Sequence, residues 1–269
     1  MTAREWLGNT IGAAWAPTIG LIAQARHARL FHPEGIVLQA TIEPVDDDPL
    51  GVHLAGNAIG RFSAALWKRA EYFDVLGFAL RIRPPASRVL DEHPVPGDQD
   101  LLFATIRSPF TMGLSPFTTH AGDFLANRYY AVSPFAIPPT NAHVKLRLVP
   151  IDPPSDSGGS RAARLSTALA ENRADLSLEM RPTFAMGYRP IARVRLAGAL
   201  PLDQQQLRFD PFRDGRDVVP VGLVHAIRRN AYAASRAATT ALRSRPRSGE
   251  AAAASSADRS PRTPDLHSV

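Results

Sequence analysis

The chain has 269 residues, of which 45% are hydrophobic and 21% charged, and this is enough apolar material for one large core. It contains no cysteine, so disulfides, iron–sulfur clusters and thiolate-bound zinc are excluded, and any metal must bind through His, Tyr, carboxylates or a cofactor. The net charge of +6 would suit an acidic partner, but the arginines are scattered rather than grouped, so nucleic-acid binding is not expected.

The first predicted element is a helix over residues 3–29. Its apolar stretch from Ile11 to Ile22 is interrupted by Pro17 and Gly20 and lacks the basic flank of a secretory signal. We therefore predict neither a membrane span nor a signal, and we expect a cytoplasmic protein.

Strand-like composition then recurs along the chain, and the turn-rich segment 44–49 separates the first two strands as in a hairpin. Many strands without a regular βαβ rhythm predict an α+β fold, an antiparallel β-barrel with added helices. The predicted strands cover residues 36–42, 53–66, 77–83, 100–107, 144–149, 175–181 and 191–200.

Two later helices are predicted, over residues 161–171 and, opened by Pro220, over 221–242. From residue 244 onward Ala, Ser, Pro and Arg dominate, a composition typical of disorder. The sequence therefore predicts one domain over residues 1–243 and a disordered basic tail over 244–269.

The last predicted helix carries a pair of residues that could bind a metal ion. Arg228 and Tyr232 stand four apart, so the guanidinium and the phenol share one helix face. A phenol titrates near about 10, so it binds iron as an anion only when the metal and a cation stabilise the phenolate. The pair indicates a tyrosine-ligated iron, with His225 as the alternative ligand. The competing interpretation is a surface Arg beside a half-buried Tyr.

Two further segments carry candidate site residues near the start of the barrel. His32 stands between the first helix and the first strand, where an anchored imidazole could act as acid and base, although a packing histidine is the other interpretation. Arg61 and Ser63 are two apart in a predicted strand and therefore face the same side. A strand Arg in water is again the alternative.

Six short segments, taken together and in this order, resemble the haem catalase superfamily. That resemblance implies that His32 is the distal acid–base residue and that Ser63 hydrogen-bonds it. It also implies that Arg29 and Arg61 pair with the haem propionates, and that Tyr232 is the iron ligand with Arg228 bonded to its phenolate. The six segments are R-x-x-H-x-x-G at 29–35, R-F-S at 61–63, 74–79, 97–102, 106–109 and R-x-x-x-Y at 228–232.

The resemblance implies a haem b peroxidase that reduces hydrogen peroxide or organic hydroperoxides through a ferryl intermediate. The chain is most similar to the short catalase-related peroxidases, since only a brief stretch follows its last helix. It departs from the family after Asp100-Leu101-Leu102, where no distal Asn follows and Thr105 is the nearest polar residue. The implied partners are a peroxide and a reducing donor, and a homo-oligomer is left open.

Three other functions remain open at this point. The first is a fatty-acid hydroperoxide dehydratase or isomerase, which analysis of the products would distinguish. The second is a haem-binding protein without catalysis. The third is a basic barrel that binds an acidic partner and no haem.

Overall fold

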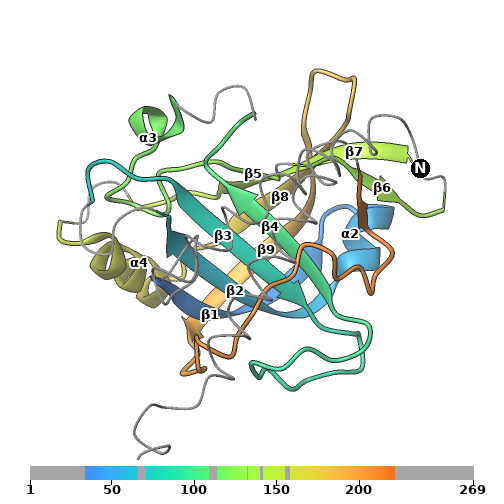
Figure 1. Ribbon diagram of the computed structural model, residues 1–269, viewed down its shortest axis with the longest axis horizontal. Coiled ribbons are helices and arrows are strands. Elements are labelled where there is room, and N and C mark those ends of the chain that lie inside the picture. The colour runs from blue at the N-terminus through green and yellow to red at the C-terminus, as the bar shows by residue number, and fades with distance from the viewer. Residues whose placement is uncertain are drawn as a thin grey trace, which may run out of the picture.

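The structure, a computed structural model, describes residues 34–65, 71–108, 114–131, 133–139, 142–154 and 158–221. These residues form antiparallel strands with three short helices between them (Figure 1). The strands are β1 (Glu34–Pro44), β2 (Gly56–Ala64), β3 (Leu76–Ile82), β4 (Gln99–Ala104), β5 (Tyr129–Ala131), β6 (Phe135–Ile137), β7 (Ala142–Pro150), β8 (Leu176–Pro182), β9 (Arg189–Ala199) and β10 (Val219–Pro220). The helices are α2 (Pro49–Leu54), α3 (Ser115–Thr118) and α4 (Arg161–Ala170).

Eight of the strands close into an antiparallel barrel, in the order β7-β5-β4-β3-β2-β1-β9-β8, because β8 pairs back with β7. Strands β6 and β10 extend the sheet beside β5, where β6 pairs with the first residues of β7. The predicted α+β barrel with added helices is therefore confirmed.

The interior of the barrel is packed with apolar side chains. Strand residues alternate between the two faces of the sheet, and the inward set includes Leu38 of β1, Phe62 of β2 and Phe78 of β3. The Phe62 ring lies 4.6 Å from that of Phe78 and 4.9 Å from that of Phe124. This packing fills the barrel, so a large ligand is expected on its outer face.

The connection between β1 and β2 differs from the prediction. A strand starting at His53 was expected, but residues 49–54 form helix α2 and the strand begins at Gly56. The Asp48 carboxylate accepts hydrogen bonds from the amides of Leu50 (3.0 Å) and Gly51 (3.1 Å), and a proline follows it at the first helical position. This cap stabilises one and a half turns of helix where the composition alone favoured a strand.

Helix α4 matches the predicted helix over residues 161–171 within one residue. Ser160 caps it by accepting a hydrogen bond from the amide of Ala163, and Leu165 and Ala168 join the barrel core. In Figure 1 α4 and α2 lie on opposite sides of the barrel. The predicted helices over 3–29 and 221–242, and the tail over 244–269, lie outside the described residues.

Candidate functional site

A row of small residues crosses four strands on the outside of the barrel. Ser63 of β2 lies opposite Gly35 of β1 and Gly77 of β3, and Gly77 lies opposite Ala104 of β4. Phe62 points inward, so alternation along β2 turns Ser63 and its row outward. We call these four residues the small-residue row. Its largest side chain is a hydroxymethyl group, so a flat molecule could lie face-on against it.

A buried cation stands beside this row. Arg61 lies two residues before Ser63 on the same face of β2 and is 4% exposed. A Cβ atom added to Gly35 would lie 2.8 Å from Cζ and Nε of Arg61, closer than real side chains approach, so the guanidinium occupies the space that the glycine leaves. Gln204 donates from Nε2 to the Gly35 carbonyl at 2.8 Å, and its Oε1 lies 3.5 Å from Nη2 of Arg61.

Hydroxyl groups lie on both sides of β3, within the row at Ser63 and just after it at Thr105. The Ser63 hydroxyl donates a long hydrogen bond, of 3.5 Å, to the Gly77 carbonyl. Thr105 follows the row on β4, and its Oγ1 accepts from the Leu76 amide at 3.2 Å. The Thr119 hydroxyl lies 2.8 Å from the same oxygen. Thr105 is therefore hydrogen-bonded into the end of the sheet.

A second apolar cluster packs on the outside of β1 and β2, next to Arg61. Val37 and Ile59 point outward and pack with Leu207, which is fully buried. Leu207 belongs to the segment 200–217, drawn in orange in Figure 1, which runs over the outer face of the barrel; at its start the Leu200 amide donates to the Val37 carbonyl at 2.9 Å. The half-buried members of this cluster are Leu90, Leu200, Leu202 and Phe209.

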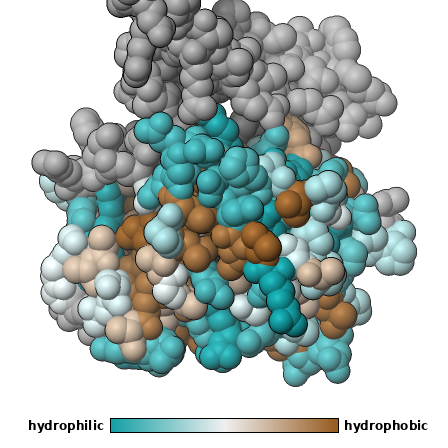
Figure 2. Space-filling model, turned by 90° about the horizontal axis from the view of Figure 1, so that it is seen from below, coloured by the Kyte–Doolittle hydropathy of each residue, from teal (hydrophilic) through white to brown (hydrophobic). Residues whose placement is uncertain are grey.

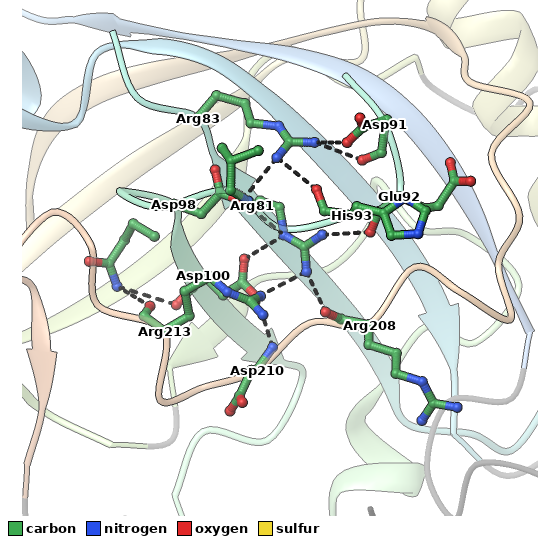
Figure 3. Close-up of polar contacts among 12 residues, drawn as sticks. Arg81, Arg83, Asp91, Glu92, His93, Asp98, Asp100, Arg208, Asp210 and Arg213 are labelled. Atoms are coloured by element: carbon green, nitrogen blue, oxygen red, sulfur yellow. Dashed lines mark hydrogen bonds and ion pairs between the residues drawn. The ribbon is translucent and has the colours of Figure 1, made fainter. Parts of the chain in front are cut away.

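One fully buried ion pair fixes this segment to the sheet (Figure 3). Arg81 of β3 donates from Nε and Nη2 to the two carboxylate oxygens of Asp100 on β4, at 3.0 and 3.3 Å. Its Nη1 bonds the Glu92 carbonyl at 3.0 Å, its Nη2 also bonds the Arg208 carbonyl, and Asp100 additionally accepts from Arg213. The pair therefore joins β3, β4, the loop before β4 and the segment 200–217.

A second ion pair lies one step further along the same face. Arg83 donates from Nη1 to Asp98 at 2.9 Å and from Nη2 to Asp91 at 2.6 Å. Among the described residues, Nε of Arg83 and Oδ1 of Asp98 are buried without a hydrogen-bond partner. These ion pairs hold the loop over residues 84–98 against the sheet, and the loop forms one edge of the candidate site.

Burial shifts the pKa of two charged groups of this region, Asp100 and Arg216. It raises the pKa of the Asp100 carboxyl above its usual value, against the opposing effect of Arg81 and Arg213. It lowers the pKa of the Arg216 guanidinium, which donates to the carbonyls of His53 (2.6 Å) and Ala55 (3.4 Å). In both groups burial disfavours the charged form, and for Asp100 the neighbouring arginines oppose this effect.

The structure places two of the predicted site residues, Arg61 and Ser63, side by side on one outer face, next to the small-residue row. Their roles toward a cofactor remain predictions. The other four, Arg29, His32, Arg228 and Tyr232, and the alternative ligand His225, lie outside the described residues.

Several residues of this face were not predicted. Gly35, Gly77 and Gln204 carry no chemical signal by themselves, and only the strand register brings them beside Arg61. The ion pairs did have a signal, since Arg81-Ile82-Arg83 and Asp98-Gln99-Asp100 each repeat a charge at a spacing of two, which puts both charges on one face.

The described part of the chain contains neither a metal-binding cluster of side chains nor a membrane-spanning helix. No group of three or more His, Asp or Glu side chains there could hold a metal ion. Nor is any helix among those residues long and apolar enough to cross a membrane.

No family model and no curated protein matches this sequence. Among solved structures 37 chains match, one of them described as the structure of a bacterial catalase. It is 13% identical to this chain, with a TM-score of 0.50 over 81% of this chain. This chain spans 59% of the length of that catalase. The fold is therefore a catalase-like barrel.

Proposed function

We propose that this catalase-like barrel is a haem-dependent peroxidase of the short catalase-related type, acting on hydrogen peroxide or organic hydroperoxides. The observation that carries the proposal is the small-residue row on the outer face of β1 to β4, with the buried Arg61 beside it. The six ordered segments of the sequence support it independently.

The residues of this face fit a flat, anionic cofactor such as haem b. Beyond Gly35, whose outer face is covered by Arg61, the row offers backbone and the small side chains of Ser63, Gly77 and Ala104, against which a planar ring system can pack. A guanidinium is the side chain best suited to bind a carboxylate through two hydrogen bonds, so Arg61 suits a propionate. Glycine at 35 leaves room for that guanidinium.

In this proposal Arg61 and Arg29 would bind the propionates, and Tyr232 would hold the iron through its phenolate, which Arg228 would stabilise. The haem iron, when bound, supplies the redox centre that peroxide cleavage requires. His32 would take a proton from one oxygen of the peroxide and return it to the other, which would leave as water from hydrogen peroxide or as an alcohol from an organic hydroperoxide. Ser63 orients the imidazole of His32 by a hydrogen bond.

The Tyr232→Phe variant tests the cofactor assignment. Phenylalanine has no oxygen to bind iron, so we expect the purified variant to lose most of its haem and to change its absorption in the Soret region. Tyr72→Phe is the matched control, because Tyr72 is 86% exposed and should keep the wild-type spectrum. Unchanged haem content and spectrum in Tyr232→Phe would overturn the assignment, as would a wild-type protein that takes up no haem on reconstitution.

The His32→Ala variant tests the acid–base assignment. Haem content should be retained, because in this proposal Tyr232 and not His32 would hold the iron, while the rate of peroxide cleavage per haem falls by about 10² to 10⁴. Stopped-flow spectroscopy with hydrogen peroxide and with an alkyl hydroperoxide measures this rate. His93→Ala, at an exposed loop histidine, should react like the wild type. A wild-type rate per haem in His32→Ala would remove His32 from the mechanism.

A further inference from the structure

The loop between β8 and β9 exposes two large apolar side chains. Phe184 is 98% exposed and Met186 is 97% exposed, more than any other large apolar residue in the described ranges. They stand two residues apart in the loop, which extends well beyond the barrel in Figure 1. A monomer gains nothing from a phenylalanine and a methionine held in water, so the loop is a candidate contact surface.

The backbone of this loop is held in place although the side chains of Phe184 and Met186 are almost fully exposed. Arg181 donates from Nη1 to the carbonyls of Thr183 (3.2 Å) and Ala185. Thr183 donates from its amide and from its hydroxyl to the His143 carbonyl at the start of β7, each at 2.9 Å. The loop therefore presents Phe184 and Met186 on a preorganised turn.

Positive charge surrounds the base of the loop. Lys145 of β7 lies directly opposite Arg181 of β8, and neither forms an ion pair with a carboxylate of the described residues. Like charges at opposed positions destabilise a sheet unless an anion lies nearby. Tyr188, two residues after Met186, lies against these charges, with the Arg147 and Arg181 guanidinium carbons 4.1 and 5.2 Å from its ring centroid.

We propose that the β8–β9 loop binds the surface of an anionic lipid bilayer, with Phe184 and Met186 inserted among the acyl chains. From its tip to its base, the loop carries the succession of side-chain types that binding at a membrane–water interface requires. Apolar side chains come at the end, then an amphipathic tyrosine, and then lysine and arginine at the depth of the headgroup phosphates. The unpaired charges of Lys145 and Arg181 find their counter-ions in those phosphates.

Charge favours this partner over a second copy of the chain. A two-fold contact through this loop would bring Lys145 and Arg181 toward their own copies, in a chain whose net charge is already +6. A broader apolar region lies in the middle of the face shown in Figure 2, but nothing in the structure shows what covers it, and it carries no proposal. The loop proposal does not depend on the proposed enzyme activity.

Co-sedimentation of the full-length protein with vesicles tests the proposal. Phosphatidylcholine vesicles are compared with vesicles in which about a third of the lipid is phosphatidylglycerol, where wild-type protein should bind far better. The double variant Phe184→Ser/Met186→Ser should bind the anionic vesicles about tenfold more weakly or worse, because both inserted side chains are lost. Lys145→Gln should weaken that binding about fivefold and leave the phosphatidylcholine result unchanged.

A matched control uses apolar residues exposed elsewhere on the barrel. Tyr72→Ser/Val89→Ser should bind like the wild type, and thermal melts show that every variant is folded. Wild-type protein that does not bind anionic vesicles would overturn the proposal. So would equal binding by the Phe184→Ser/Met186→Ser variant, which would assign the affinity to the basic tail. Light scattering measures the oligomeric state of the wild type and of the Phe184→Ser/Met186→Ser variant. If the variant only dissociates an oligomer, the partner of the loop is a second copy of the chain and the bilayer proposal is overturned.

Discussion

Arg81 and Asp100 are both fully buried, and their value to the protein lies in what they hold together. Removing two charges from water is costly, and the attraction between them offsets that cost only when the remaining donors and acceptors are also satisfied. Here they are, since Arg81 also bonds the Glu92 and Arg208 carbonyls and Asp100 accepts from the Asp210 amide at 2.8 Å. The pair therefore fixes two irregular segments against the outer face of the barrel.

The Arg213→Gln variant should change how stability depends on pH. Burial already raises the pKa of Asp100 above 3.8, and loss of a neighbouring cation raises it further. A carboxyl whose folded pKa is raised adds stability that is fully present below pH 3.8, the unfolded value, and is lost as pH rises through the folded pKa. The variant should therefore keep losing stability up to a higher pH than the wild type does.

Urea unfolding at intervals from pH 3.8 upward measures this difference. Arg195→Gln is the control, because Arg195 pairs with Glu43 on the exposed surface and should leave the slope unchanged. Superimposable profiles for Arg213→Gln and wild type would show that Arg213 does not act on Asp100.

At the scale of elements, helix α2 shows how one side chain can override composition. The segment after Asp48 was predicted to enter a strand, yet two amides bonded to one carboxylate fix a helical turn there. Close packing also requires glycine at position 51 of this helix, since a Cβ atom there would collide with the Ile191 carbonyl of β9. Helix α2 therefore packs against β9 at Gly51.

The Asp48→Ala variant should lower the free energy of unfolding by about 1 to 2 kcal/mol, because two amides at the start of α2 lose their acceptor. Asp48→Asn keeps an acceptor at the cap and should retain most of that stability. It does lose the ion pair with Arg189, a residue that is half exposed, and such a pair contributes little. Equal losses in the two variants would show that the ion pair, and not the cap, stabilises the helix.

At the scale of the whole molecule, barrel closure decides where a ligand can bind. Because β8 pairs with β7, the inner faces of eight strands meet and fill the interior with apolar side chains. Polar and small residues lie on the outside. There the segment 200–217 and the loop over 84–98 form the edges of one part of the sheet. The small-residue row and Arg61 lie in that part.

Deletion of residues 244–269 should leave the melting temperature and the haem content of the protein nearly unchanged. The composition of this predicted tail offers too little apolar surface to offset the entropy of ordering it. Thermal melts and the absorption spectrum of the truncated chain measure both quantities. Failure of the truncated chain to fold would show that the tail is part of the domain.

The sequence by itself determined the class of fold and most of the barrel strands. Alternation and composition are local properties, so they predicted strands that overlap β1 to β4 and β7 to β9, and also helix α4. The short strands β5, β6 and β10 were missed, because two or three residues contain no full period. The order of six short segments led to the catalase resemblance, and the neighbouring positions of Arg61 and Ser63 placed both on one face.

Only the tertiary structure decided what stands beside those two residues. Gly35, Gly77 and Ala104 meet Ser63 through the register of three strand pairs, and Gln204 reaches Gly35 across 169 positions of chain. Register and closure depend on which distant segments pair, and no local pattern encodes that choice. Residues as far apart in the sequence as Arg61 and Gln204 can share one face only through such long-range contacts.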